Sequence, residues 1–477
     1  MQSWLRAALV SGGLSLLAPW VHAQTDSTPR PALPALNLPV ASASGQQAID
    51  LLGAQLDAVA AHHRRSAAQL RELLLRDATV RIDARGRLFV IDELEQPLAA
   101  RPATANASAV AAARPAPLDQ TFALHSRPGA KRTVYLNFKG AVLTGTAWNG
   151  SGGTITALPF DSDGHVDTNF ADSELERIQY IWQRVAEDFA PLDIDVTTEA
   201  PRAARLTRAS DTDQVYGTTV LITHNSGVYN CSCGGVAYVG VFDMVGDFYK
   251  PALVFWNMLG SGDEKYVAEA ISHEAGHNLG LSHDGYSGGG YYPGHGSGET
   301  GWAPIMGVGY YKNLVQWSQG EYATANNTED DFAVMAANGG PRRADDHGDT
   351  PATATPLTAT ASGGQSLLSG QGVIERRKDV DAFSFEAGAG PGTVTVQPDT
   401  RSANLDVYVR LIDAAGQVIA KAKPAATLAA TLSFTLPAAG TYYVLVDGVG
   451  LGDVAGTGYS DYGSLGQYTV SGTVPTR

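Results

Sequence analysis

The 477-residue chain is poor in cysteine and in charge, and each shortage excludes a class of protein. Two cysteines are too few for a disulfide-rich scaffold, and only 17% of the residues are charged. With 33 Lys and Arg against 48 Asp and Glu, the formal net charge is −15. This acidic balance argues against nucleic acid or an anionic membrane surface as the main partner. The length predicts two or three domains.

Long hydrophobic runs are also scarce, and the longest lies at the N-terminus. Residues 7–17 are apolar and follow the basic Arg6, but they are shorter than the about 20 residues that cross a bilayer. Val21-His22-Ala23 fits the small-residue rule for cleavage. We therefore expect residues 1–23 to be a secretory signal peptide, and the mature protein to be exported, soluble and not bound to membrane.

Residues 24–118 have a different composition from the rest of the chain. Pro- and Ala-rich linkers flank an apolar stripe that predicts a helix over residues 47–77, and a pattern that predicts two strands over residues 80–91. A small unit of this kind between a leader and a main domain suggests a prosegment. A small N-terminal domain that stays attached is the alternative.

Residues 119–343 alternate strands with long helices, which predicts an α/β (α+β) domain with a mixed sheet. This segment carries 14 basic and 26 acidic residues and therefore holds most of the negative charge. The strands are expected at residues 133–138, 193–198, 218–223, 236–242 and 252–256, and the helices at residues 171–189 and 264–279. Residues 344–477 show short alternating runs separated by Gly, Pro and Asp, which predicts an all-β sandwich.

The chemistry is concentrated in His273-Glu-Ala-Gly-His277-Asn-Leu-Gly280-Leu-Ser-His283-Asp284. On a helix, His273 and His277 project from one face and can share a metal, and Glu274 is placed to take a proton from a metal-bound water. Gly280 can adopt the left-handed conformation that ends a helix and returns His283 as a third ligand. Three imidazoles and a water would make an open, catalytic zinc site.

This motif resembles that of the metzincins, which are zinc endopeptidases with an elongated three-histidine motif, and Asp284 resembles the adamalysin/reprolysin branch. The resemblance implies that Met306, in Trp302-Ala-Pro-Ile-Met306-Gly307, forms the turn beneath the metal. It also implies that Asp284 either bonds backbone near that turn or orients a histidine ligand. The segment 234–242 resembles the strand at the edge of the metzincin sheet, which pairs with an extended peptide substrate.

Some features of related families are missing. Val308 stands where other branches have a tyrosine that can reach the metal, so a tyrosine ligand is not expected. Cys231 and Cys233 are the only cysteines, so no prosegment thiol can silence the zinc. These two cysteines either bond to each other or stay free near the cleft, and the sequence leaves both possibilities open.

The C-terminal segment resembles the bacterial pre-peptidase C-terminal domain, a β-sandwich appended to secreted peptidases. The matching motifs include Asp345-Asp346-His-Gly, Asp379-Val-Asp381-Ala-Phe and Gly440-Thr-Tyr-Tyr-Val. The resemblance implies that Asp345, Asp346, Asp379 and Asp381 hold calcium; solvated turn carboxylates are the alternative.

The sequence thus predicts a secreted zinc-dependent endopeptidase that acts on proteins or peptides as a monomer. In this interpretation Glu274 is the general base and His273, His277 and His283 hold one Zn²⁺. Two alternatives stay open: a secreted binding or adhesion protein with a vestigial zinc site, and a processing protease with narrow specificity.

Overall fold

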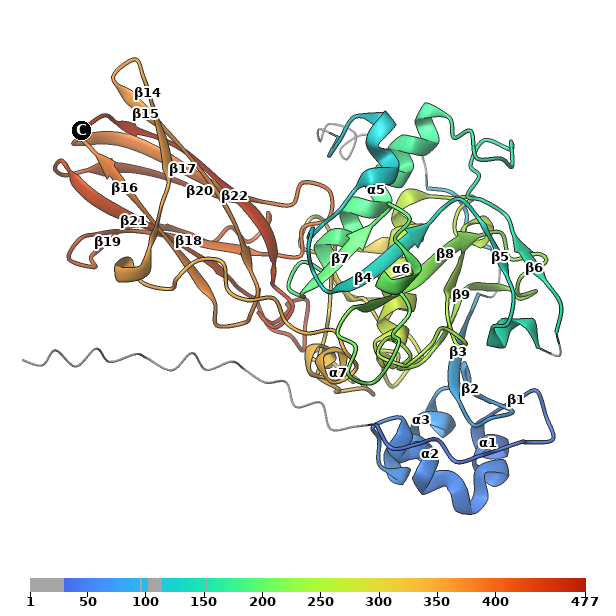
Figure 1. The fold of residues 1–477 in the computed structure, drawn as a ribbon. Helices are drawn as coiled ribbons and strands as arrows, with labels where there is room; N and C mark the ends of the chain where they lie inside the picture. The colour runs from blue at the N-terminus through green and yellow to red at the C-terminus, as the bar shows by residue number, and fades with distance from the viewer. Residues whose placement is uncertain (1–29, 95–96, 102–113, 151) are drawn as a thin grey trace, which may run out of the picture.

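The computed structural model describes residues 30–94, 97–101, 114–150 and 152–477. The predicted leader lies outside these ranges. Figure 1 shows three parts: a small N-terminal unit, a central domain built on a sheet, and an elongated β-rich C-terminal domain. Within the described residues, no helix is long and apolar enough to cross a membrane.

Among its described residues, the N-terminal unit contains three short helices and a strand hairpin. The elements are β1 (Ser42–Ser44), α1 (Gly45–Leu52), α2 (Leu56–His62), α3 (Ala67–Arg76), β2 (Val80–Asp83) and β3 (Leu88–Glu93). The prediction of one helix over residues 47–77 is wrong, because the chain turns at Arg64, with φ +57°, and restarts at Ser66. Ser66 and Gln69 form a reciprocal capping box that begins α3.

The central domain confirms the predicted mixed α/β class. Its elements are β4 (Arg132–Asn137), β5 (Ala141–Leu143), β6 (Ile155–Ala157), α5 (Asp172–Asp188), β7 (Ile194–Thr197), β8 (Tyr216–Thr223), β9 (Cys233–Tyr238), β10 (Ala252–Phe255), α6 (Glu264–Asn278), β11 (Trp302–Pro304), β12 (Leu314–Gln316) and α7 (Asp331–Ala337). Strands β10, β8, β4 and β7 run parallel, and β9 joins them antiparallel through β10. Helices α5 and α6 pack against each other, and α6 also packs on β8, β9 and β10.

The sheet does not end at β9. Its order is β1-β2-β3-β9-β10-β8-β4-β7, so the N-terminal hairpin extends the sheet of the central domain. In Figure 1, β2 and β3 rise from the N-terminal helices toward β9. Strand β9 is thus the last strand contributed by the central domain, as expected for the segment 234–242, but it ends at Tyr238 and β3 already occupies its open side.

The C-terminal domain consists of two five-stranded sheets, which confirms the predicted sandwich class. One has the order β13-β16-β21-β18-β19 and the other β14-β15-β22-β17-β20. Their bounds are β13 (Thr355–Pro356), β14 (Thr358–Ser362), β15 (Gln365–Ile374), β16 (Val380–Ala387), β17 (Gly390–Pro398), β18 (Val407–Asp413), β19 (Val418–Ala422), β20 (Ala430–Leu436), β21 (Gly440–Gly448) and β22 (Gly466–Pro475). Alternate residues of β20 are buried and exposed, the pattern of a sheet with one face in the core.

Candidate metal centre

Helix α6 carries the first two histidines through the core. It begins at Asp263, whose carboxylate accepts hydrogen bonds from the backbone of Lys265 and Tyr266, and it is buried along its whole length. It ends just before Gly280, which has φ +102°, and the amide of Gly280 donates to the carbonyl of His277. A side chain at Gly280 would be strained there and would also meet Asn338. This turn brings His283 back to the helix.

The three histidines converge through their Nε2 atoms. The Nε2 atoms of His277 and His283 are 3.1 Å apart, and one ring nitrogen from each of the three histidines belongs to a set of atoms that all lie within 4.8 Å of one another. Tetrahedral zinc with bonds of about 2.0–2.1 Å would place its ligands about 3.3 Å apart. The His273 Nε2 atom is buried and makes no hydrogen bond among the described residues. An inward-facing nitrogen of this kind fits a metal ligand.

The outer nitrogens of the same rings are all satisfied. Nδ1 of His273 lies 2.9 Å from the carbonyl of Ile305, and Nδ1 of His277 lies 2.8 Å from the carbonyl of Leu281. Nδ1 of His283 lies 2.6 Å from an oxygen of Asp77. These acceptors hold each proton on Nδ1, which leaves Nε2 free to bind a metal.

Met306 is fully buried beneath helix α6, which carries His273 and His277. A Cβ added at Gly276 would lie 2.7 Å from its sulfur, so the glycine between the two helical histidines makes room for the methionine. The amide of Asp284 donates to the carbonyl of Met306 at 2.8 Å, which joins the histidine turn to the methionine turn. The carboxylate of Asp284 lies 3.4 Å from the side-chain nitrogen of Asn327. The bond to the methionine turn is made by the backbone of Asp284, and its carboxylate contacts Asn327 instead, so neither role expected for this side chain is seen; Asp77 orients His283.

Glu274 lies against strand β9 beside a small cavity. Its side chain is buried, and an added Cβ at Gly235 would come within 2.0 Å of its Oε1 atom. Only glycine at position 235 leaves space for this carboxylate. The cavity of about 70 Å³ is lined by Glu274, His273, Tyr310 and residues of both β3 and β9, among others. Its size and position suit a water molecule or a small reacting group next to the histidines.

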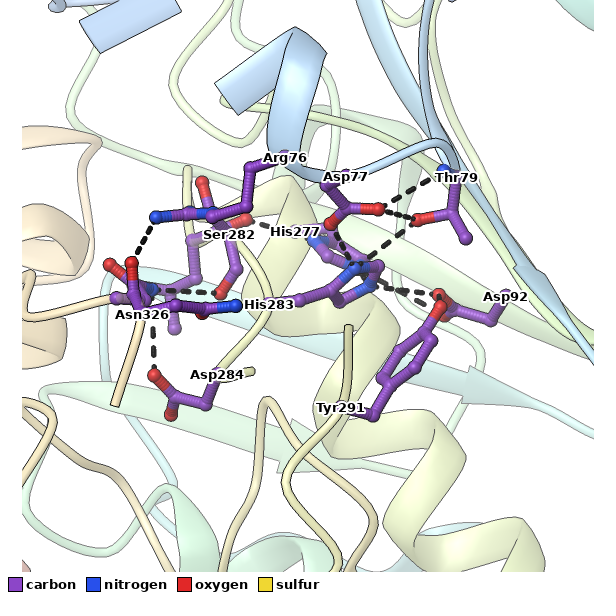
Figure 2. A network of polar contacts seen from close by, with 12 residues as sticks. Arg76, Asp77, Thr79, Asp92, His277, Ser282, His283, Asp284, Tyr291 and Asn326 are labelled. Carbon is purple, nitrogen blue, oxygen red and sulfur yellow. Dashed lines mark hydrogen bonds and ion pairs between the residues drawn. The ribbon is translucent and has the colours of Figure 1, made fainter. Parts of the chain in front are cut away.

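Three residues at this centre were not anticipated from the sequence: Asp77, Asp92 and Tyr291. Asp92 enters from β3, and its Oδ1 lies 2.9 Å from His283 Nε2 (Figure 2). Its Oδ2 lies 3.4 Å from His273 Nε2. The Tyr291 hydroxyl donates to Asp92 Oδ1 at 2.8 Å, and its ring packs on His283 with centroids 4.3 Å apart. No local motif marks these residues, because they reach the site only through long-range packing.

Comparison with known proteins agrees with this geometry. Residues 177–284 match the model of reprolysin-like metallopeptidases of family M12B, and residues 379–448 match that of the bacterial pre-peptidase C-terminal domain. The chain carries a reprolysin-like metallopeptidase domain followed by a pre-peptidase C-terminal domain. No curated protein matches the chain.

Similar solved structures are distant. The pre-peptidase C-terminal domain of collagenase from Bacillus anthracis is 16% identical and covers 26% of this chain and 99% of its own, with a TM-score of 0.18. Bacillus endospore appendages that form disulfide-linked pili give 12% identity, coverages of 25% and 98%, and a TM-score of 0.10. OgpA from Akkermansia muciniphila is 12% identical and covers 63% of this chain and 85% of its own, with a TM-score of 0.15. At these TM-scores the similarities carry no argument about this protein.

Electrostatics in the metallopeptidase domain favour neutral helical histidines. Burial lowers the pKa of His273, and burial together with the neighbouring histidines lowers the pKa of His277 to about 3. Burial also acts to lower the pKa of His283, but Asp77 and Asp92 outweigh it and raise this pKa to about 10. Two carboxylates thus favour a positive charge at His283, which a divalent cation at Nε2 would supply.

The calcium prediction in the C-terminal domain gains no support. Asp345 and Asp379 do lie near each other and near Glu375. The carboxylate of Asp346 instead pairs with Arg343 at 3.2 Å, and that of the buried Asp381 accepts a hydrogen bond from Tyr468. The four aspartates therefore do not form one ligand set.

The two cysteines of the metallopeptidase domain are joined to each other. Cys231 and Cys233 form a disulfide, so neither is a free thiol near the cleft. Cys233 is the first residue of β9, and Cys231 lies two residues before it. It therefore lies beside the strand that faces the metal centre.

Proposed function

We propose that this protein is a secreted zinc endopeptidase that is made with an inhibitory N-terminal prosegment. The observation that carries the proposal is the convergence of three buried Nε2 atoms, each ring held by an outer hydrogen bond, beside the carboxylate of Glu274. Three imidazoles are a ligand set that catalytic zinc uses. Secretion rests on the predicted signal peptide at residues 1–23.

The protein's own residues would divide the work as follows. His273, His277 and His283 would hold the zinc, which when bound supplies Lewis acidity toward a water and the scissile carbonyl. Glu274 would accept the proton of the attacking water and deliver it to the leaving amine. Tyr291 would donate a hydrogen bond to the substrate oxygen that takes the place of Asp92 Oδ1.

The substrate would bind as an extended peptide. Strand β9 is antiparallel to β10 on one side, and on the other it offers a backbone edge that β3 occupies in this chain. Once β3 has left, a peptide segment would pair with the same edge by strand addition. In this mode, hydrogen bonds to the peptide backbone bind the substrate, and pockets around the cleft select the side chains next to the cleaved bond.

The test uses protein from which the N-terminal unit has been removed after folding. We expect it to hydrolyse casein, to lose this activity with 1,10-phenanthroline, and to regain it with one equivalent of Zn²⁺. His277→Ala should bind no stoichiometric zinc and should be inactive. Retention of zinc without cleavage of any protein substrate would contradict the proposal and favour a binding protein with a vestigial site.

A further inference from the structure

Strand β3 makes an irregular pairing with β9 at the metal centre. Phe89, Val90 and Ile91 pair in order with Tyr238, Ala237 and Val236, and the register then shifts so that Glu93 pairs with Cys233. One residue of β3, Asp92, is therefore opposite two residues of β9. A bulge of this kind redirects the side chain at that point.

The two residues opposite Asp92 are both glycine. At Gly235 an added Cβ would collide with Glu274, and at Gly234 it would lie 3.3–3.4 Å from Leu259 and Tyr310. The two glycines thus leave space for Glu274, Leu259 and Tyr310 beside the bulge, and the Asp92 side chain reaches the histidines at the same place. Its two oxygens face different histidines, His283 through Oδ1 and His273 through Oδ2.

We propose that Asp92 is the fourth ligand of the metal in the uncleaved chain and that it closes the site from within. This inference rests on the proposed function, since it requires the three histidines to hold a metal. The ligand atoms of Asp92 and the three histidines all lie within 4.8 Å of one another. Three imidazole nitrogens and one carboxylate oxygen complete a tetrahedral zinc set and leave no position for water.

The segment that follows Asp92 is bonded to the metallopeptidase domain at several points. The amide of Leu94 donates to the carbonyl of Ser232 at 2.8 Å, and the hydroxyl of Ser232 donates back to the carbonyl of Leu94 at 2.8 Å. Farther on, the amide of Leu98 donates to the carbonyl of Met258. Arg101 then contacts both carboxylate oxygens of Asp263 at 2.9 Å, at the start of the active helix. These bonds hold the chain after Asp92, and the pairing of residues 89–91 with β9 holds it before Asp92.

A second group of contacts fixes the N-terminal unit on the histidine turn. Asp77 holds Nδ1 of His283, and Arg65 reaches the Ser282 hydroxyl at 2.7 Å and Glu329 at 3.3 Å. The same unit therefore contributes a metal ligand and orients a neighbouring one. Cleavage in the linker after Arg101 would turn this intramolecular ligand into a separate peptide that can dissociate.

The test uses cobalt as a spectroscopic substitute for zinc in the full, uncleaved chain. Wild-type protein should bind one Co²⁺, and its visible spectrum should not change when acetohydroxamate is added. Asp92→Ala should alter the spectrum, weaken Co²⁺ binding by about tenfold or more, and allow acetohydroxamate to change the spectrum further. Glu93→Ala is the matched control, because it removes a carboxylate that is 59% exposed on the same strand.

Asp92→Asn keeps the shape of the side chain and guards against a folding defect in the alanine variant. It should also open the centre to acetohydroxamate, because a neutral amide is a poorer ligand than a carboxylate. Identical spectra and responses for wild type and both Asp92 variants would overturn the inference. If His277→Ala still binds Co²⁺ like wild type, the proposed metal site itself fails. If the processed protein cleaves nothing but Asp92→Ala still changes the spectrum, the ligand assignment stands and the peptidase proposal falls.

Discussion

The N-terminal unit and the C-terminal domain both pack on the metallopeptidase domain, but they do so in opposite ways. The N-terminal unit has its own hydrophobic core, to which the metallopeptidase domain adds only Val239 among the described residues. The C-terminal domain shares one continuous core with the metallopeptidase domain, in which Phe189 and Trp317 belong to the same cluster as Leu405 and Leu465.

The polar contacts repeat this difference. The N-terminal unit is held by charged side chains, such as Arg65, Asp77 and Arg101, and by strand β3, whose Phe89 and Ile91 pack in a small apolar cluster with residues of the metallopeptidase domain. The C-terminal domain inserts buried polar groups instead, including Asn404, whose amide donates to Asp188 at 2.7 Å. A unit with its own core can leave intact, whereas a domain that shares its core cannot leave without exposing apolar surface. The comparison therefore predicts a removable N-terminal unit and a permanent C-terminal domain.

The largest effect should follow from cutting the linker after Arg101. A tethered ligand acts at an effective concentration of about 1 mM, so even micromolar affinity keeps about 99.9% of the sites closed. Dilution after cleavage should raise casein hydrolysis by about a thousandfold. Equal activity of the uncut and cut protein, measured at nanomolar concentration, would refute the removable unit.

Leu70→Ala should unfold the N-terminal unit alone. Leu70 is fully buried in its separate core, and a change of this kind costs about 2–5 kcal/mol. Calorimetry should show an early transition for this unit and an unchanged transition for the rest, and the uncut chain should gain activity. Leu75→Ala on the same helix removes a side chain that is 55% exposed, and it should cause neither the early transition nor the gain of activity. A lower melting temperature for all three parts of the molecule would mean that their cores unfold together.

Asn404→Ala should weaken the shared core of the other two domains. It leaves a buried oxygen of Asp188 without its partner, at a cost of about 1–3 kcal/mol. We expect the metallopeptidase and C-terminal domains of this variant to melt together at a lower temperature than in the wild type. Gln417→Ala is the control, because Gln417 is exposed and its loss should leave the melting temperature unchanged. Separate melting of the two domains would contradict a shared core.

Arg65→Ala should have the smallest effect, because Arg65 acts only in holding the N-terminal unit on the metallopeptidase domain. Loss of its bonds to Ser282 and Glu329 is expected to cost about 1.4 kcal/mol and to raise the residual activity of the uncut chain about tenfold. The exposed Arg71 provides the control, as Arg71→Ala should leave this activity unchanged. An unaltered activity in Arg65→Ala would show that this contact does not hold the unit in place.

Local patterns were sufficient for most of the fold. The periodicity over residues 171–189 predicted α5 to within a residue at each end, and the histidine motif placed α6. The break between α2 and α3 was missed, although Ser66 with Gln69 three residues later is a readable start signal. In the C-terminal domain, β13, β14, β15 and β19 were not predicted as strands.

The missing part of the site depends on contacts that are distant in sequence. His283 and Asp92 are separated by 191 residues, and Asp77 and His283 by 206. Nothing around Asp92 distinguishes it from an ordinary polar residue on a strand. Its position follows from the pairing of β3 with β9 and from the shift of register at Asp92, which is information that only the tertiary structure holds.

We propose that Glu274 and the three histidines form a working peptidase site. The most direct measurement compares processed wild type with processed Glu274→Gln for both zinc content and casein hydrolysis. We expect one zinc per chain in both proteins and a loss of hydrolysis by about 10²–10⁴-fold in the variant, because the amide cannot accept the proton of water. Undiminished hydrolysis by Glu274→Gln with its zinc in place would show that Glu274 is not the general base.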